Sequence, residues 1–496
     1  MAINPILINP IPDQDIITGT NTTGISINLS NYFDDPSTTG LIASFTLQDE
    51  TIGVGQINAL LFDQPGFGAP LTVQNFANYV YKGAYTNSFI HRSVPGFVVQ
   101  GGGFTIDQDL NPTAIPTDPP VVNEFNPIRS NVRGTLAMAK TSDPNSATSQ
   151  WFFNLADNSQ SLNSPSNSGG FTVFGQVLSQ DDLNTIDAIA SVPVYNSGGV
   201  FSQLPLLQNP PNSPDDLVVF NDVSIYDAEE LSFTPVQNSN PSLIEVNTDG
   251  SNLTLNYAPG QYGRAQVTVS ATTLLGQSID YTFNVTVVDP IEYAASNPDI
   301  IPVYGYNPEA YAQHYLNFAK TNGRSIDSFD AKRYLASYDD LLNKYGNDPG
   351  AATLHYVQYG AIPPENRDPK LFDPAQYLAS HDDLLNTFGS NTSLAQDHFL
   401  NTWADEHRVR DKFQEDIYIA SYPDLIENLG YNLQAATDHF INRGFPIEHR
   451  ARQIFDPAAY LNKYTDLQAA YGNDLRAATE HYIRSGYNEI YNLHTR

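Results

Sequence analysis

The chain has 496 residues, 41% of them hydrophobic, and this length and composition favour two to four folded domains over disorder. Acidic residues number 54 against 23 basic ones, and the formal net charge of −31 disfavours nucleic acid and anionic lipid as partners. Cysteine is absent, which excludes disulfides, cysteine-ligated metals and thiol nucleophiles.

The sequence predicts neither a secretory signal peptide nor a membrane-spanning segment. Residues 1–10 have no basic start and no long apolar stretch, so no secretory signal peptide is predicted there. No run of 18 apolar residues occurs, so no membrane-spanning segment is expected.

Alternating apolar and polar residues predict β-strands early in the chain and again well downstream. The period-two segments are 25–29, 253–257, 265–269 and 281–287. Residues 1–38 resemble the first strands of a bacterial immunoglobulin-like or cadherin-like sandwich, and residues 227–289 resemble its remaining strands. These flanks therefore predict one β-sandwich made from two separated segments.

Neither flank is long enough to close a sandwich of roughly 100 residues alone, whereas the two together are. Insertion at a surface loop is tolerated because the ends of a domain often lie close together. We therefore expect residues 39–226 to be a separate domain inserted into the sandwich. The alternative is an N-terminal arm that pads this domain, followed by a separate small β-domain.

The segment 89–102 places one permanent cation, Arg92, near an aromatic ring, Phe97, and an amide, Gln100. Its pattern, F-x-H-R-x-x-P-G-F-x-x-Q-G-G, resembles the signature of the cyclophilins, the peptidyl-prolyl cis-trans isomerases. Further segments match that family in order and spacing: 69–79, 134–139, 145–153 and 171–177. The resemblance implies a closed β-barrel with capping helices for residues 39–226.

The resemblance also implies roles for particular residues. Arg92, Gln100 and Phe97 are the expected catalytic residues. The expected substrate-binding residues are His91, Val94, Met138, Ala139, Lys140, Gln150, Phe152, Leu162 and Phe171. Within this set, Phe97, Met138, Phe152 and Leu162 are expected to line an apolar slot for the proline ring. No cofactor or metal is expected, because this chemistry needs only a cation and an apolar slot.

Four positions depart from the family pattern. Lys140 stands where many cyclophilins have asparagine, and Ser161 stands where tryptophan is common. Phe171 replaces a histidine or tyrosine, and Trp151 replaces the first phenylalanine after Gln150. We expect these changes to affect substrate preference and inhibitor affinity more than the role of Arg92.

Residues 290–496 predict an all-α region of five helix-pair repeats of about 42 residues. A tyrosine recurs once per repeat, and a histidine follows each tyrosine by 21 positions, namely Tyr293/His314, Tyr334/His355, Tyr377/His398, Tyr418/His439 and Tyr460/His481. Phe-Asp-Pro at 372–374 and 455–457 predicts helix starts with aspartate as the N-cap. We expect structural rather than metal-binding histidines, and the sequence names no partner for the repeats.

The leading hypothesis is a bacterial-type isomerase that accelerates X–Pro rotation in proline-containing peptides or proteins. The alternative is a surface or extracellular interaction protein whose cyclophilin-like domain only binds proline-containing partners. The flanking modules and the acidity favour an extracellular or cell-surface location, with the cytoplasm as the other possibility.

Overall fold

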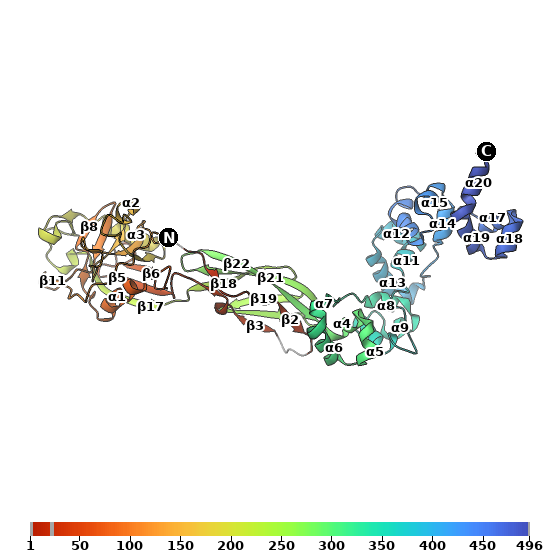
Figure 1. The fold of residues 1–496 in the computed structure, drawn as a ribbon, viewed down its shortest axis with the longest axis horizontal. Helices are drawn as coiled ribbons and strands as arrows, with labels where there is room; N and C mark the ends of the chain where they lie inside the picture. Colours follow the sequence, from red (N-terminus) through yellow and green to blue (C-terminus); the bar gives the residue numbers. More distant parts are fainter. Residues whose placement is uncertain (1–2, 20–23, 495–496) are drawn as a thin grey trace. The chain divides into compact units, whose positions relative to one another are not determined.

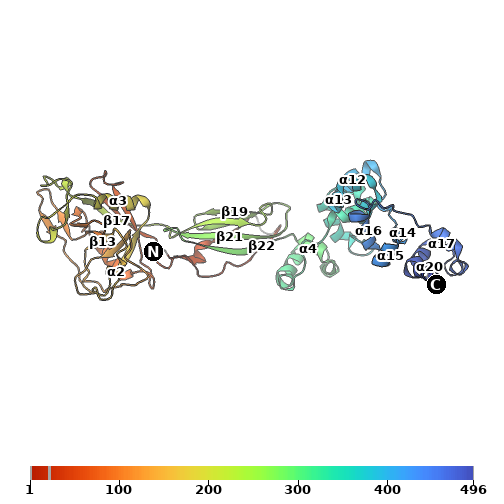
Figure 2. The same cartoon turned by 90° about the horizontal axis from the view of Figure 1, so that it is seen from above.

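The computed structural model describes residues 3–19 and 24–494. It divides into two units: one takes in the chain up to Ile16 and from 24 to Val287, and the other takes in 17–19 and the chain from Val288 onward. The predicted segments 1–38 and 290–496 include residues 1–2, 20–23 and 495–496, which lie outside the described residues. Figures 1 and 2 show the fold in two views.

Residues 41–227 form a single curled antiparallel sheet. Its strands are β5 (Leu41–Leu47), β6 (Gln56–Leu61), β7 (Ser88–Phe89), β8 (Arg92–Val94), β9 (Val98–Gly101), β10 (Phe104–Ile106), β11 (Pro112–Ala114), β12 (Thr135–Met138), β13 (Trp151–Asn154), β14 (Val173–Val177) and β17 (Val219–Asp227). Their hydrogen-bonded order is β11-β10-β7-β17-β5-β6-β14-β12-β13-β9-β8. This order has two ends, so the expected closed barrel is instead a curled sheet that hydrogen bonding leaves open between β11 and β8.

Helices pack against this sheet through apolar faces. They are α1 (Pro70–Tyr81), α2 (Ser159–Leu162) and α3 (Gln180–Ala190). Helix α1 begins with Pro70 at its first position and buries Val73, Phe76 and Val80, which recur at helical spacing. Helix α3 begins with a capping box between Ser179 and Asp182. The apolar side chains of α1, together with Ile186 and Ile189 of α3, meet the inner face of the sheet in one buried core.

A segment after α3 folds back toward β8. It contains β15 (Val194–Tyr195), β16 (Leu204–Pro205) and two short 3-10 turns, η2 (Gly199–Phe201) and η3 (Pro214–Asp216). The backbone N–H of Ser93 donates to the carbonyl of Gln203 at 2.8 Å. This segment therefore reaches the strand that carries Arg92.

The rest of the first unit is two sheets around one apolar core. Its strands and turn are β1 (Ile6–Leu7), β2 (Gln14–Ile17), β3 (Ile25–Asn28), η1 (Leu29–Asn31), β4 (Phe33–Asp34), β18 (Leu231–Asn238), β19 (Ile244–Asp249), β20 (Asn252–Tyr257), β21 (Gly263–Thr273) and β22 (Ser278–Val288). The sheets run β18-β21-β22-β2 and β19-β20-β3, and β1 pairs with β4. Strand β3 pairs with β20, with Ile27 opposite Leu253. The red first strands accordingly lie among the green later strands in Figure 1.

The second unit is helical. Its helices are α4 (Pro290–Ser296), α5 (Ile301–Tyr304), α6 (Pro308–His314), α7 (Lys320–Asn322), α8 (Ala331–Ser337), α9 (Asp339–Tyr345), α10 (Pro349–His355), α11 (Pro374–Ser380), α12 (Asp382–Phe388), α13 (Thr392–Glu406), α14 (Glu415–Ala420), α15 (Pro423–Leu429), α16 (Leu433–His439), α17 (Pro457–Lys463), α18 (Thr465–Tyr471), α19 (Leu475–His481) and α20 (Tyr487–His494). A 3-10 turn, η4 (Pro298–Ile300), follows α4. The predicted N-caps are present, since the side chains of Asp373 and Asp456 accept backbone N–H groups of α11 and α17.

Each tyrosine of the 42-residue spacing bonds its histidine. The hydroxyl-to-Nδ1 distances lie between 2.7 and 3.1 Å in all five pairs. Each of these histidines therefore has the tyrosine hydroxyl of its own repeat as a hydrogen-bond partner. The tyrosine–histidine bond joins the first helix of each repeat to its third, so the expected helix pair is instead a set of three helices, such as α8, α9 and α10.

Four third helices continue into a wide π turn: η5 (Tyr315–Ala319), η6 (Tyr356–Gly360), η7 (Phe440–Gly444) and η8 (Tyr482–Gly486). The last three end in glycine, because the hydroxyl of the repeat's tyrosine occupies the space that the Cβ of any other residue would need. At Gly444, an added Cβ would come within 2.1 Å of the Tyr418 hydroxyl oxygen. The third repeat has Trp403 at this position, and its third helix, α13, stays α-helical through Glu406.

Candidate active site

A cavity of about 240 Å³ opens on the outer face of the curled sheet. Its lining residues are Arg92, Phe97, Val98, Gln100, Ala139, Lys140, Phe152, Leu162 and Phe171. Eight of these nine belong to the set predicted from the sequence, although they span 80 positions of the chain. The fold therefore brings one cation, one amide and several apolar side chains to a single small space.

Strand register explains why Arg92, Gln100 and Phe152 face the cavity together. Arg92 lies opposite Gln100 across β8 and β9, and Gln100 lies opposite Phe152 across β9 and β13. Residues directly opposite one another on neighbouring strands point to the same face of a sheet. The three side chains therefore form one row across three strands.

Amide oxygens hold the guanidinium of Arg92. Its Nε donates to Oε1 of Gln203 at 3.0 Å, and its Nη1 donates to Oε1 of Gln100 at 3.2 Å. The Nε2 of Gln100 donates in turn to Oε1 of Gln150 at 2.8 Å. Burial lowers the pKa of Arg92, but the group remains charged because the ordinary pKa of arginine lies above 12. The cation is thus oriented without a carboxylate on it.

His91 lies behind this network rather than in the cavity. Its side chain is 3% exposed, and the ring packs edge-on to Phe104 at 5.3 Å between centroids. Burial, and after it the positive charge of Arg92, lowers the pKa of His91 to about 4, against the opposing effect of a hydrogen bond with Gln150. His91 is therefore neutral at pH 7 and supports Gln150.

The apolar wall of the cavity is fixed by main-chain bonds. The carbonyl of Phe97 accepts the N–H of Leu155 and the side-chain amide of Asn158, each at 2.8 Å. The N–H of Phe171 donates to the carbonyl of Leu162 at 2.8 Å, and the Phe171 ring packs edge-on to Phe152. A slot with rigid aromatic and aliphatic walls can hold a ring the size of proline.

Four predicted residues do not line the cavity. Gln150 and His91 support Gln100 from behind, and Val94 lies two residues beyond Arg92 on β8. The expectation that Met138 lines the slot is wrong: it is 1% exposed and lies in the inner core. Successive side chains of a strand point to opposite faces, so Ala137 faces outward and Met138 inward.

Two residues of the site were not predicted. Val98 lines the cavity two positions before Gln100 on the same strand, so strand alternation could have identified it. Gln203 contacts Arg92 from 111 positions away. It comes from an irregular segment with no periodicity, and no sequence signal connects it with Arg92.

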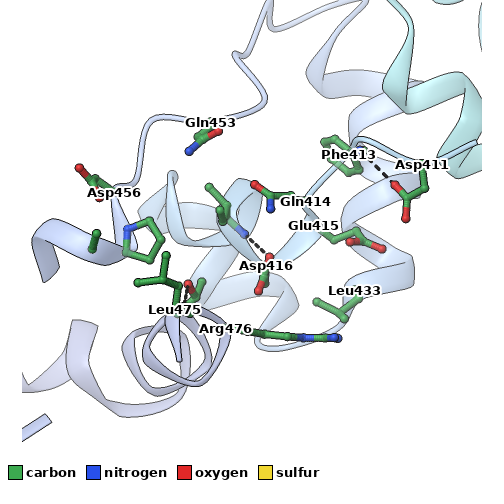
Figure 3. Close-up of a pocket in the computed structure, with 14 residues that line it drawn as sticks. Asp411, Phe413, Gln414, Glu415, Asp416, Leu433, Gln453, Asp456, Leu475 and Arg476 are labelled. Atoms are coloured by element: carbon green, nitrogen blue, oxygen red, sulfur yellow. Dashed lines mark hydrogen bonds between the residues drawn. The ribbon is translucent and has the colours of Figure 1, made fainter. Parts of the chain in front are cut away.

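A second cavity, of about 560 Å³, lies between the last two repeats (Figure 3). Acidic side chains gather in its wall: Asp411, Glu415, Asp416 and Asp456, with Arg476 nearby. Burial raises the pKa of Asp411 and Glu415. Gln414 stands at the N-cap of α14 and makes no side-chain cap bond, unlike Asp373 in α11. Carboxylates share this cavity with its cation, whereas no carboxylate of the described residues lines the first cavity, so the two differ in chemistry.

Residues 3–19 and 24–494 contain no helix that is both long and apolar enough to cross a membrane. The same ranges contain no group of three or more histidine, aspartate or glutamate side chains arranged to hold a metal ion.

Comparison with known proteins points to the same segment. The family model described as "Cyclophilin type peptidyl-prolyl cis-trans isomerase/CLD" matches residues 46–209. A peptidyl-prolyl cis-trans isomerase of Acinetobacter baylyi is 37% identical over 173 residues, which cover 35% of this chain and 83% of that protein. Peptidyl-prolyl cis-trans isomerase A of Dickeya dadantii is 40% identical, over 33% of this chain and 77% of that protein. Peptidyl-prolyl cis-trans isomerase B of Escherichia coli is 42% identical, over 26% of this chain and 77% of that protein. The chain belongs to the cyclophilin-type peptidyl-prolyl cis-trans isomerase family.

Proposed function

We propose that residues 39–226 accelerate rotation about X–Pro bonds by means of Arg92 and the apolar slot. The X–Pro bond has partial double-bond character, with a barrier of about 18–20 kcal/mol, and uncatalysed isomerisation takes roughly 10–100 s. Catalysis requires interactions that are stronger in the twisted transition state than in either planar isomer.

Arg92 supplies such an interaction. Twisting the bond removes the resonance between nitrogen and carbonyl, so the lone pair of the prolyl nitrogen becomes free to accept a hydrogen bond. A guanidinium N–H aimed at that nitrogen stabilises the twisted state and gains nothing from the planar one. Phe97, Phe152 and Leu162 hold the proline ring while the preceding residue turns.

The observation that carries this proposal is the way in which Arg92 is held. Gln100 and Gln203 fix its direction through neutral oxygens, so its charge is not cancelled by a carboxylate. An arginine that only stabilises the fold has no need to face a cavity beside an apolar slot.

The test is Arg92→Ala in the full chain, assayed on a proline-containing peptide and on a protein whose refolding is limited by proline isomerisation. Loss of the donor should lower kcat/KM by at least ~100-fold. Arg133→Ala is the matched control, because Arg133 pairs with Asp187 on the surface of the same domain. Unchanged turnover in Arg92→Ala contradicts the proposal. Peptide binding by the wild type without rate acceleration would favour the binding-only alternative.

We also propose that the isomerase is inserted into an immunoglobulin-like or cadherin-like sandwich formed by residues 1–38 and 227–289. The pairing of β3 with β20 and the shared core of the two sheets support this arrangement. After proteolysis near 36–40, the fragment 1–36 should stay associated with residues 229–289. Dissociation of the N-terminal fragment would favour the arm that pads the isomerase.

We propose further that residues 290–496 are five repeats of one helical unit on an extracellular or cell-surface protein. The five tyrosine–histidine pairs support the repeats, and the net charge of −31 is compatible with that location. Cell fractionation tests the location, and recovery of the chain with cytoplasmic markers alone would contradict it.

A further inference from the structure

Basic residues are few in the isomerase segment, and most of them are already occupied. Lys82 pairs with Asp118, and Arg133 pairs with Asp187. Arg129 is buried, and its guanidinium donates to backbone carbonyls such as that of Val173. Each of these three cations is used by the fold.

Arg92 and Lys140 are the cations of this segment that line the cavity, whereas Arg129, which has no carboxylate partner among the described residues either, is buried against backbone carbonyls. Over the part of the chain that the structure describes, neither Arg92 nor Lys140 has a carboxylate oxygen within 4.0 Å. A protein with a net charge of −31 thus keeps two cations without ion-pair partners at one small site.

Contacts on one side fix the ammonium group of Lys140. Its Nζ donates to the carbonyl of Ser168 and lies 4.8 Å from the centroid of the Phe171 ring. An ammonium has three N–H donors, so two are left for other acceptors. Burial lowers the pKa of Lys140, and the negative charge of Asp143 opposes this shift without forming an ion pair.

Strand order places the two cations on opposite sides of the slot. Lys140 follows β12, Arg92 lies on β8, and β13 and β9 run between them. Neighbouring strands are about 4.8 Å apart, so the two backbones are separated by roughly 14 Å. An extended peptide covers that span with about four residues. When a proline ring occupies the slot, residues adjoining it pass close to Lys140.

Building on the proposed isomerase function, we propose that Lys140 makes the enzyme select X–Pro segments that carry a carboxylate within two residues of the proline. Arg92 acts on the bond, and Lys140 reads the charge of the flanking residue. The substrate class is then acidic, proline-containing segments of proteins, in spite of the general repulsion from an acidic enzyme.

The experiment uses the full chain and matched short peptides with Glu, Gln or Lys placed, in turn, at each of the two positions before and the two positions after proline. We expect the wild type to show a kcat/KM about three- to fivefold higher for Glu than for Gln at one of these positions, as is usual for a partly exposed ion pair. Lys140→Gln should abolish that preference, and Lys140→Glu should reverse it in favour of Lys. Raising the salt concentration to about 1 M should reduce the wild-type preference, since the screening length falls to about 3 Å.

Lys82→Gln is the matched control. It removes the same charge from the same domain, and its Nζ likewise lies over an aromatic ring, that of Tyr79. This variant should keep the wild-type preference. Loss of the preference in Lys82→Gln would show that net charge, rather than Lys140, is responsible, and would overturn the inference.

Failure of this inference is distinguishable from failure of the proposed function. Equal turnover of Glu and Gln peptides by an active wild type overturns the role of Lys140 and leaves the isomerase proposal intact. If no peptide is turned over, the isomerase proposal is wrong, and fluorescence anisotropy of labelled peptides then decides the matter. Tighter binding of Glu than Gln peptides that disappears in Lys140→Gln supports the charge selection, and equal binding overturns it.

Discussion

The arginine of the candidate site and the ion-paired arginines of the helical repeats are held in opposite ways. Arg92 is held by the amide oxygens of Gln100 and Gln203. In the repeats, Arg367 binds Asp340 and Glu365, each at 2.7 Å, and Arg450 binds Asp424 and Glu448. Ion pairing raises the pKa of Arg367 and Arg450, whereas burial lowers that of Arg92.

This difference separates an arginine that is available to a substrate from one that is committed to the fold. A carboxylate cancels most of the field of its partner and occupies its donors. An amide oxygen fixes direction while leaving the charge in place. The chemical type of an arginine's partners therefore indicates whether its charge can act elsewhere.

The histidines follow the same contrast. His91 is buried, and its Nδ1 has no hydrogen-bond partner among the residues that the structure describes. His439 instead joins Tyr418 through Nδ1 and faces Glu448 through Nε2 at 3.9 Å. The isomerase keeps a neutral buried ring that supports Gln150, while His355, His398 and His439 of the repeats each lie within 4.0 Å of a glutamate oxygen.

The largest expected effect comes from removing one arginine of each kind. Arg92→Ala should reduce kcat/KM by at least ~100-fold with little change in unfolding. Arg450→Ala should leave turnover unchanged and lower the stability of the helical region by about 1–2 kcal/mol, since its partners are partly exposed. Peptide assays and urea unfolding followed by circular dichroism measure the two effects. A fall in turnover in Arg450→Ala would break the comparison.

The second effect is a pH dependence of stability caused by His91. Its pKa is about 4 in the folded protein and 6.5 when unfolded, so below pH 6.5 the unfolded chain binds a proton that the folded chain does not. Stability is therefore lost as pH falls from 6.5 to 4, by up to about 3 kcal/mol.

A variant with Trp403→Phe leaves buried Trp151 as the sole tryptophan, so fluorescence then follows the unfolding of the sheet. In that background, His91→Gln should flatten the pH dependence of stability between pH 4 and 6.5. His407→Asn changes an exposed histidine and serves as control. If stability changes equally with pH in the His91→Gln variant and in its parent, the inference that His91 is neutral in the folded protein is wrong.

The third prediction concerns a substitution that gives Arg92 a carboxylate partner, as the arginines Arg367 and Arg450 of the repeats have. Gln203→Glu places a carboxylate on Arg92 and should lower kcat about tenfold, because the cation then gains less from the prolyl nitrogen in the transition state. Gln203→Asn retains an amide and should lie closer to the wild type. If Gln203→Glu and Gln203→Asn are equally active, the neutrality of the partner is irrelevant.

The smallest effect is that of salt. High salt should weaken the partly exposed ion pairs of the repeats and lower the stability of that region by about 0.5–1 kcal/mol. Turnover of a peptide without charged side chains should not change over the same range, since Arg92 acts within a partly buried site. A parallel loss of both quantities would show that the two regions do not differ in their use of charge.

Much of this site could be predicted from local sequence. Arg92 and Gln100 lie eight residues apart on adjacent strands joined by a short turn, so their spacing already determines that they pair. The repeats could equally be predicted from the sequence, because each tyrosine and histidine recurs at a fixed interval and the N-cap aspartates precede proline. Local periodicity is sufficient wherever the partners are close in the chain.

Other features depended on the tertiary structure. Met138 was expected in the slot, but the alternation of β12 turns it inward, and only the position of Ala137 opposite Phe152 decides which face is which. Closure of the sheet was expected, yet the strand order leaves two ends. These properties depend on register between distant strands, which no short motif encodes.

The sequence by itself determined the cation, the amide beside it, the apolar residues of the slot and the period of the helices, because each is carried by a short pattern. Only the tertiary structure decided that Gln203 orients Arg92, that Lys140 lies at the same cavity without a carboxylate partner, and that Met138 does not line it. The physical reason is that hydrogen bonds and fields act over a few ångströms in space, and positions more than a hundred residues apart come within that range only when the sheet has formed.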